Sequence, residues 1–123
     1  MTVMDRRYRQ IEVERQGDVF CVRLRQRNMS EEDLHQFSDE LNDLVERQGC
    51  RKLVLNLGPQ GPLCLYSIFL AKLVSLQRRL SQAGGGLQLA HVGPDIYKIF
   101  EACRLQTLFS FAPDQSSAIA ALS

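Results

Sequence analysis

The chain has 123 residues, of which 45% are hydrophobic and 24% are charged, and both fractions are close to those of ordinary globular proteins. This size and composition exclude a disordered or fibrous chain and predict a single domain over residues 1–123. Fifteen Lys and Arg against fourteen Asp and Glu give a net charge of +1, so no overall positive field favours nucleic acid as a partner.

The sequence carries no signal for a membrane or a metal. Its longest apolar stretches fall short of the roughly 18 residues that a membrane span needs, and its start lacks the apolar core of a signal peptide. We therefore expect a cytoplasmic protein with no membrane partner. The cysteines form no C-x-x-C pair, so we expect reduced thiols, no metal site and no cofactor; they are Cys21, Cys50, Cys64 and Cys103.

The first predicted elements form a β-hairpin. Residues 9–14 alternate polar and apolar side chains, with Ile11 and Val13 on one side. Gly17 and Asp18 then supply a turn, and an apolar run over residues 19–24 follows. We expect this second strand to be partly buried on both faces.

An acidic helix follows the hairpin. Residues 31–50 hold seven acids against one arginine, and the apolar positions predict a single buried stripe of Leu34, Phe37, Leu41, Leu44 and Val45. Ser30 is expected to be the N-cap, and Gly49 to end the helix. The acids lie mainly on the opposite face, which is either a solvated surface or a docking surface for a basic partner.

The middle of the chain predicts a strand, a loop and a second helix. Residues 53–57 are almost wholly apolar, as in a central parallel strand that is covered on both faces. The loop 58–62 leads to a helix whose apolar face runs from Phe69 to Leu80. Gly84 is expected to end this helix.

The last third of the chain predicts four more elements. Residues 86–92 resemble a strand, and Gly93-Pro94-Asp95 begins a short helix. A last short strand is expected within residues 105–111, followed by a C-terminal helix that Asp114 caps. The predicted fold class is α/β: a mixed, mostly parallel sheet of four to five strands, with an N-terminal antiparallel hairpin and about four helices.

No catalytic pattern stands out in the sequence. The loop 58–62 has the place of a phosphate-binding loop, but it lacks a Gly-Lys-Ser/Thr ending and its two prolines remove N–H groups. Neither His35 nor His91 belongs to a recognisable catalytic or metal-binding motif. We therefore expect a binding protein rather than an enzyme, and a small-molecule or nucleotide-binding module stays open as an alternative.

Several segments stand in a familiar order and spacing along the chain: residues 52–57, 64–73, 83–89, 93–97 and 105–109. Together they resemble the STAS domain family, the sulphate transporter and anti-sigma factor antagonist domains. The resemblance covers about residues 8–122 and implies a stand-alone domain of the antagonist type, active in signal transduction and the regulation of transcription.

The resemblance also implies a mechanism and a switch residue. In the family, the antagonist binds an anti-sigma factor that is also a serine kinase, phosphorylation of one hydroxyl ends the interaction, and a serine phosphatase restores it. The acceptor position falls on Ser67. The candidate partner-binding residues are Tyr66, Ser67, Ile68, Phe69 and Lys72.

Three residues around the acceptor depart from the family pattern. In the family pattern an acid precedes the acceptor serine, and a small residue and then a glycine follow it. In this chain those three positions hold Tyr66, Ile68 and Phe69. Ser67 is therefore either a phosphorylation site or an ordinary first-turn helix serine, and its three neighbours either an apolar partner patch or core. An adaptor or assembly module without phosphoregulation is the main alternative function, and a homodimer stays open.

Overall fold

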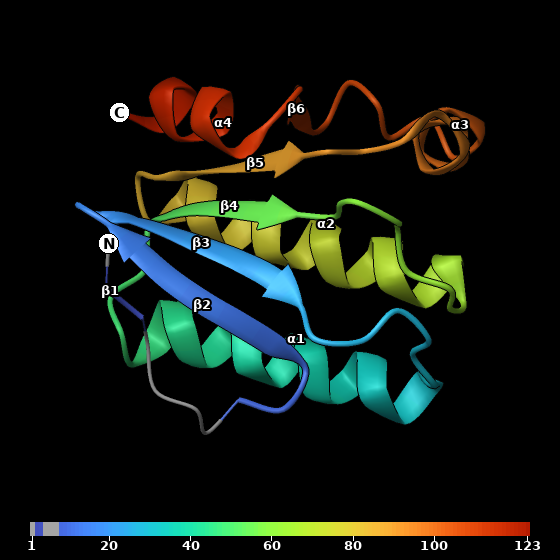
Figure 1. Cartoon of the computed structure of the whole chain (residues 1–123), viewed down its shortest axis with the longest axis horizontal. Coiled ribbons are helices and arrows are strands. Elements are labelled where there is room, and N and C mark those ends of the chain that lie inside the picture. The colour runs from blue at the N-terminus through green and yellow to red at the C-terminus, as the bar shows by residue number, and fades with distance from the viewer. Residues whose placement is uncertain (1, 4–7) are drawn as a thin grey trace.

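The computed structural model describes residues 2–3 and 8–123, and it confirms an α/β fold built on one mixed sheet (Figure 1). The strands pair in chain order: β1 (Thr2–Val3), β2 (Ile11–Gln16), β3 (Val19–Leu24), β4 (Lys52–Asn56), β5 (Gly86–Ala90) and β6 (Ser110–Ala112). The helices are α1 (Glu31–Glu46), α2 (Tyr66–Gln82), α3 (Pro94–Ala102) and α4 (Gln115–Leu122).

Pairing directions follow the prediction. β2 pairs with β3 as an antiparallel hairpin, whereas β3, β4, β5 and β6 pair in parallel. The two-residue strand β1, antiparallel to β2, was not expected, because so short a segment has no periodicity to detect. The last strand covers only Ser110–Ala112, since residues 105–109 are mostly turns.

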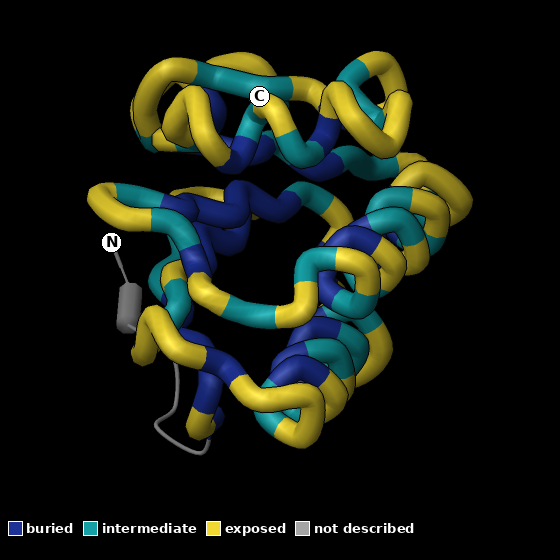
Figure 2. The backbone as a smooth tube through the Cα atoms, turned by 90° about the vertical axis from the view of Figure 1, so that its right-hand side faces the viewer, coloured by how far each residue is buried: buried dark blue, intermediate teal, exposed yellow. Residues whose placement is uncertain are grey.

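The two faces of the sheet have different cores. The face under α1 and α2 is filled by large side chains, and Figure 2 shows the buried positions of these helices turned toward the sheet. β4 alternates between the faces, as a strand must: Leu53 and Leu55 join this large core, and Val54 joins the other. The opposite face is covered by α4 and holds the smaller cluster, centred on Val19, Cys21, Val54, Ala90 and Ala118.

One acid of α1 does not follow the expected pattern. Glu40 is buried, and its carboxylate accepts the backbone N–H groups of Arg9, at 2.8 Å, and Gln10, at 2.9 Å. The prediction that the acids lie mainly on an exposed face therefore misses this residue. Glu40 instead holds the chain just before β2 against α1, because the buried N–H group of Gln10 needs an acceptor.

The topology brings three helix N-termini to one end of the sheet. The chain enters α1, α2 and α3 from the carboxyl ends of β3, β4 and β5, on the right in Figure 1. In parallel α/β sheets this end is where ligands and partners bind most often. Within the described part of the chain, no helix combines the length and the apolar character needed to cross a lipid bilayer.

Candidate functional site

Ser67 lies in the first turn of α2, and its side chain is exposed to solvent. The N-cap is Leu65, which has an extended backbone and no side chain that could accept a hydrogen bond. The first turn contains no acidic residue. The N-terminus of α2 therefore keeps its positive dipole end and its first N–H groups with no side chain hydrogen-bonded to them as a cap.

The loop before α2 is fastened at several points. Leu63 exchanges backbone hydrogen bonds with the segment after β3: its N–H donates to Arg27 O at 2.9 Å, and its O accepts from Met29 N at 3.0 Å. The Tyr66 hydroxyl donates to Pro62 O at 2.7 Å. These contacts hold the approach to Ser67 in one conformation and use the polar end of Tyr66 inside the chain.

Phe69 is not part of a partner surface, contrary to the sequence prediction. Its side chain is fully buried and stacks on Phe37 of α1, with ring centroids 5.9 Å apart. The physical reason is helical periodicity, because Phe69 falls on the same stripe as Leu73, Leu76 and Leu80, which face the sheet. Tyr66 and Ile68 are half-buried and pack against the edge of the core.

The structure brings Ser67, Ile68 and Lys72 together along a surface groove between α1 and α2. Its charged lining residues are Lys72 on α2 and Asp39 on α1. The remaining lining side chains are small or polar, namely His35, Ser38, Asn42, Ala71 and Ser75. The groove is the feature that sequence reasoning missed, because it depends on the packing of two helices about thirty residues apart. The acidic face of α1 was the only signal of it.

Apolar side chains flank Ser67 on the loop side. Leu63 is 45% exposed and Leu65 is 54% exposed, and they stand four and two residues before Ser67 in the chain. Between them, Cys64 is half-buried, and burial raises the pKa of its thiol to about 11, so it stays protonated at neutral pH. The tip of α2 thus combines exposed apolar area with an uncovered helix N-terminus.

The loop 58–62 uses some of its polar groups internally. The Gly58 N–H donates to Asn56 Oδ1 at 2.9 Å, and the Gly61 carbonyl accepts from Arg27 Nε at 3.0 Å. A phosphate-binding loop needs N–H groups that point outward, and the prolines at positions 59 and 62 supply none. Nothing in this loop's geometry favours a bound triphosphate.

Comparison with known proteins identifies the fold. No family model matches the chain, and no curated protein matches it in sequence. A provisionally named anti-sigma factor antagonist of Thermotoga maritima superposes with a TM-score of 0.78 at 19% identity, covering 94% of this chain and 96% of that one. A STAS domain protein of Planctomyces limnophilus gives 0.72 at 16% identity, over 92% and 98%. The chain has the STAS domain fold.

A third solved structure shows this fold in a modified state. The Bacillus cell fate determinant SpoIIAA, in its phosphorylated form, superposes with a TM-score of 0.69 at 14% identity, covering 92% of this chain and 99% of that one. These identities are low, and what the three structures share with this chain is the arrangement of strands and helices.

Proposed function

We propose that this STAS domain is an anti-sigma factor antagonist that acts by partner switching, with Ser67 as its switch. Its partners would be a serine-kinase-type anti-sigma factor and a serine phosphatase, both in the cytoplasm. The observation that carries the proposal is the exposed Ser67 hydroxyl at the uncapped start of α2. A protein of the same fold, SpoIIAA, has been solved in a phosphorylated form.

A phosphate on Ser67 would cost little free energy in the free domain and much more in the complex with a partner. A phosphate on Ser67 would add about −1.5 to −2 charges. The positive end of α2 accommodates that charge, so the free domain stays folded. A partner packed on Leu63, Leu65 and the start of the groove would have to bury it, and desolvating an unpaired charge is costly. Phosphorylation would therefore end the interaction and leave the domain intact.

The test uses the purified domain, ATP and a purified serine-kinase-type anti-sigma factor from the source organism. We expect a stable complex without ATP, and one phosphate on Ser67, mapped by mass spectrometry, after ATP is added. Ser67→Ala should bind and remain unlabelled. Ser75→Ala is the matched control, because Ser75 is also exposed on α2 and lines the same groove; it should be labelled like the wild type.

A second function, an adaptor without phosphoregulation, is favoured by one observation. Tyr66 and Ile68, the neighbours of Ser67, are bulky and half-buried, whereas a kinase works most easily on a small and open segment. This alternative predicts that the complex forms, that no phosphate appears on Ser67, and that Ser67→Asp and Ser67→Ala bind alike. Failure to bind any such anti-sigma factor would remove both functions.

A further inference from the structure

Strands β3 and β4 separate and meet again, and the opening between them is closed at both ends. The last paired residues of the ladder are Arg23 and Asn56, and an isolated bridge between Asn28 and Leu63 rejoins the two segments. Between these points, residues 24–27 and 57–62 form the two sides of the opening. Because backbone hydrogen bonds fix both ends, this opening is already formed in the free protein.

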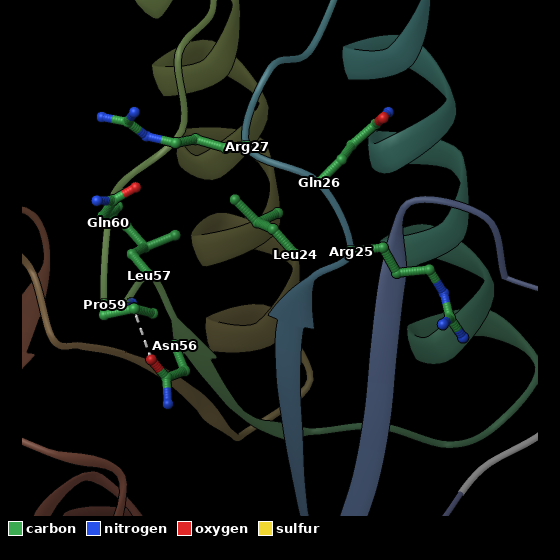
Figure 3. Close-up of a pocket in the computed structure, with 9 residues that line it drawn as sticks. Leu24, Arg25, Gln26, Arg27, Asn56, Leu57, Pro59 and Gln60 are labelled. Carbon is green, nitrogen blue, oxygen red and sulfur yellow. Dashed lines mark hydrogen bonds between the residues drawn. The ribbon is translucent and has the colours of Figure 1, made fainter.

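A cavity of about 200 Å³ occupies this opening. Its lining includes the apolar side chains of Leu24 and Leu57, which Figure 3 shows between the two segments. Arg27 extends toward the loop 59–61, where its Nε donates to Gly61 O, and it also lines the adjoining pocket with Gln60. The cavity thus has an apolar part and a polar rim.

The charge of the lining selects the kind of ligand. The residues around the cavity include two arginines and no acid; the complete lining is Leu24, Arg25, Gln26, Arg27, Asn56, Leu57, Gly58, Pro59 and Gln60. Arg25 points away from the cavity and is held by Tyr8 O, at 3.0 Å, and by the Glu12 carboxylate, at 3.5 Å. Asp95 lines the adjoining pocket that Arg27 also reaches, but among the described residues Arg27 makes one hydrogen bond, through Nε, and no ion pair, so its terminal nitrogens remain for an anion.

We propose that this cavity binds a small organic carboxylate with a compact apolar body. The carboxylate would pair with the terminal nitrogens of Arg27, and the apolar body would contact the half-buried Leu24, since Leu57 is already buried in the core beneath it. The size is consistent with a ligand built on one ring, because an engineered cavity of roughly 150 Å³ holds benzene. Charge-assisted hydrogen bonds from arginine to a carboxylate are among the strongest in proteins, which makes Arg27 the main determinant of affinity.

The site lies beside the proposed switch but does not depend on it. Residues 57–60 form one wall of the cavity, and the same loop continues to Leu65, the N-cap of α2. A bound carboxylate would therefore contact the segment that holds the approach to Ser67. This gives the domain an input for a small-molecule signal whether or not Ser67 is phosphorylated.

The experiment is a titration of the ¹⁵N-labelled domain, followed by amide chemical shifts, with three probes. Benzoate has both a negative charge and an apolar ring, benzamide has the ring without the charge, and inorganic phosphate has the charge without the ring. We expect saturable shifts with benzoate, confined to residues 24–27 and 57–62, by about 10 mM, a range that saturates a site with a Kd of about 1 mM. Benzamide and phosphate should bind at least about tenfold more weakly.

Two variants identify the residue that binds the probe. Arg27→Gln should weaken benzoate binding at least about tenfold while the rest of the spectrum stays native. Arg23→Gln is the matched control: Arg23 is an exposed arginine of the same strand segment that does not line the cavity, and its loss should change the Kd less than twofold. If Arg27→Gln disturbs the loop, Arg27→Lys, which keeps the charge, should retain part of the affinity.

Five results would overturn the proposal. With the wild-type domain, they are the absence of saturable shifts with benzoate, saturable shifts centred elsewhere, equal affinity for benzamide, and equal affinity for inorganic phosphate. The fifth is an unchanged benzoate affinity in Arg27→Gln. None of these results bears on phosphorylation of Ser67, so the ligand-binding proposal and the switch proposal are tested independently.

Discussion

The two long helices begin in different ways at the same end of the sheet. α1 starts with a closed N-terminus: Ser30 Oγ accepts the Asp33 N–H at 3.1 Å, and the Asp33 carboxylate accepts the Ser30 N–H at 2.9 Å. α2 starts with Leu65 at the N-cap, no side-chain hydrogen bond and no acid in the first turn. Both helices are well formed, so α2 must be held by something other than a cap.

The two helix starts therefore differ in their capacity to bind an anion. A capped N-terminus has used its N–H groups and part of its dipole within the chain, so α1 has little to offer an anion there. The start of α2 keeps both, next to an exposed serine. Both helices pack a buried face against the sheet, but the start of α1 is also held by local hydrogen bonds, whereas the start of α2 depends on packing of the residues that follow Ser67.

The largest expected effect concerns that packing. Phe69→Ala should lower the free energy of unfolding by about 3–5 kcal/mol, because the ring is fully buried against Phe37 and the site cannot fully collapse. Urea denaturation measures the change. Ile68→Ala is the control, since Ile68 is only half-buried, and should cost less than half as much. If both variants lost the same free energy of unfolding, the buried Phe69 ring would contribute no more to α2 than the half-buried Ile68 side chain.

The next effect separates the capped helix from the uncapped one. Ser30→Ala removes the capping hydrogen bond of α1 and should cost about 1 kcal/mol. Ser67→Ala should stay within about 0.5 kcal/mol of the wild type, because the Ser67 hydroxyl caps nothing. Both values follow from the same denaturation series. A loss at Ser67 as large as that at Ser30 would show that Ser67 stabilises α2 after all.

A smaller effect tests the dipole at the start of α2. Ser67→Asp should stabilise the free domain by about 0.3–1 kcal/mol at low salt, and the gain should shrink as salt is added. Ser75→Asp, in the middle of the same helix, should give no such gain. Thermal unfolding at two salt concentrations measures both. A destabilised Ser67→Asp would contradict the idea that the free domain tolerates a charge at this position.

The smallest effect is a pH dependence at the start of α1. The Ser30 N–H holds the pKa of Asp33 below its ordinary value of 3.8, so the carboxylate stabilises the fold above that pH. This contribution is lost as the pH falls through the lowered pKa. The difference in stability between wild type and Asp33→Asn should therefore narrow in acid. A difference that stays constant from neutral pH to pH 3 would show that Asp33 acts without its charge.

The elements set by local patterns could be predicted from the sequence. Each of these features depends on residues close together in the chain, and each lies where the sequence predicts it: the Ser30 cap, the hairpin turn at Gly17 and the apolar stripes of α1 and α2. The burial of Glu40 could not be predicted, because its partners Arg9 and Gln10 lie about thirty residues away. Such a contact depends on how the segments pack.

The candidate site was predictable only in part. The sequence placed Ser67 at the start of the second helix, and the structure finds it exposed in the first turn of α2. It also placed Phe69 among the candidate partner residues, but Phe69 is buried. Neighbouring residues of a helix face different sides, so a residue next to an exposed one can lie in the core. The groove beside Ser67 and the cavity beside Arg27 arise where two elements meet, so neither has a signature in a single segment.

The most direct test of the switch compares two forms of one protein. Isothermal titration calorimetry would measure the affinity of the unmodified domain and of the Ser67-phosphorylated domain for the same purified anti-sigma factor. We expect a Kd at least about tenfold higher for the phosphorylated form, equivalent to about 1.4 kcal/mol, with both forms equally folded. Equal affinities of the two forms would contradict a switch at Ser67.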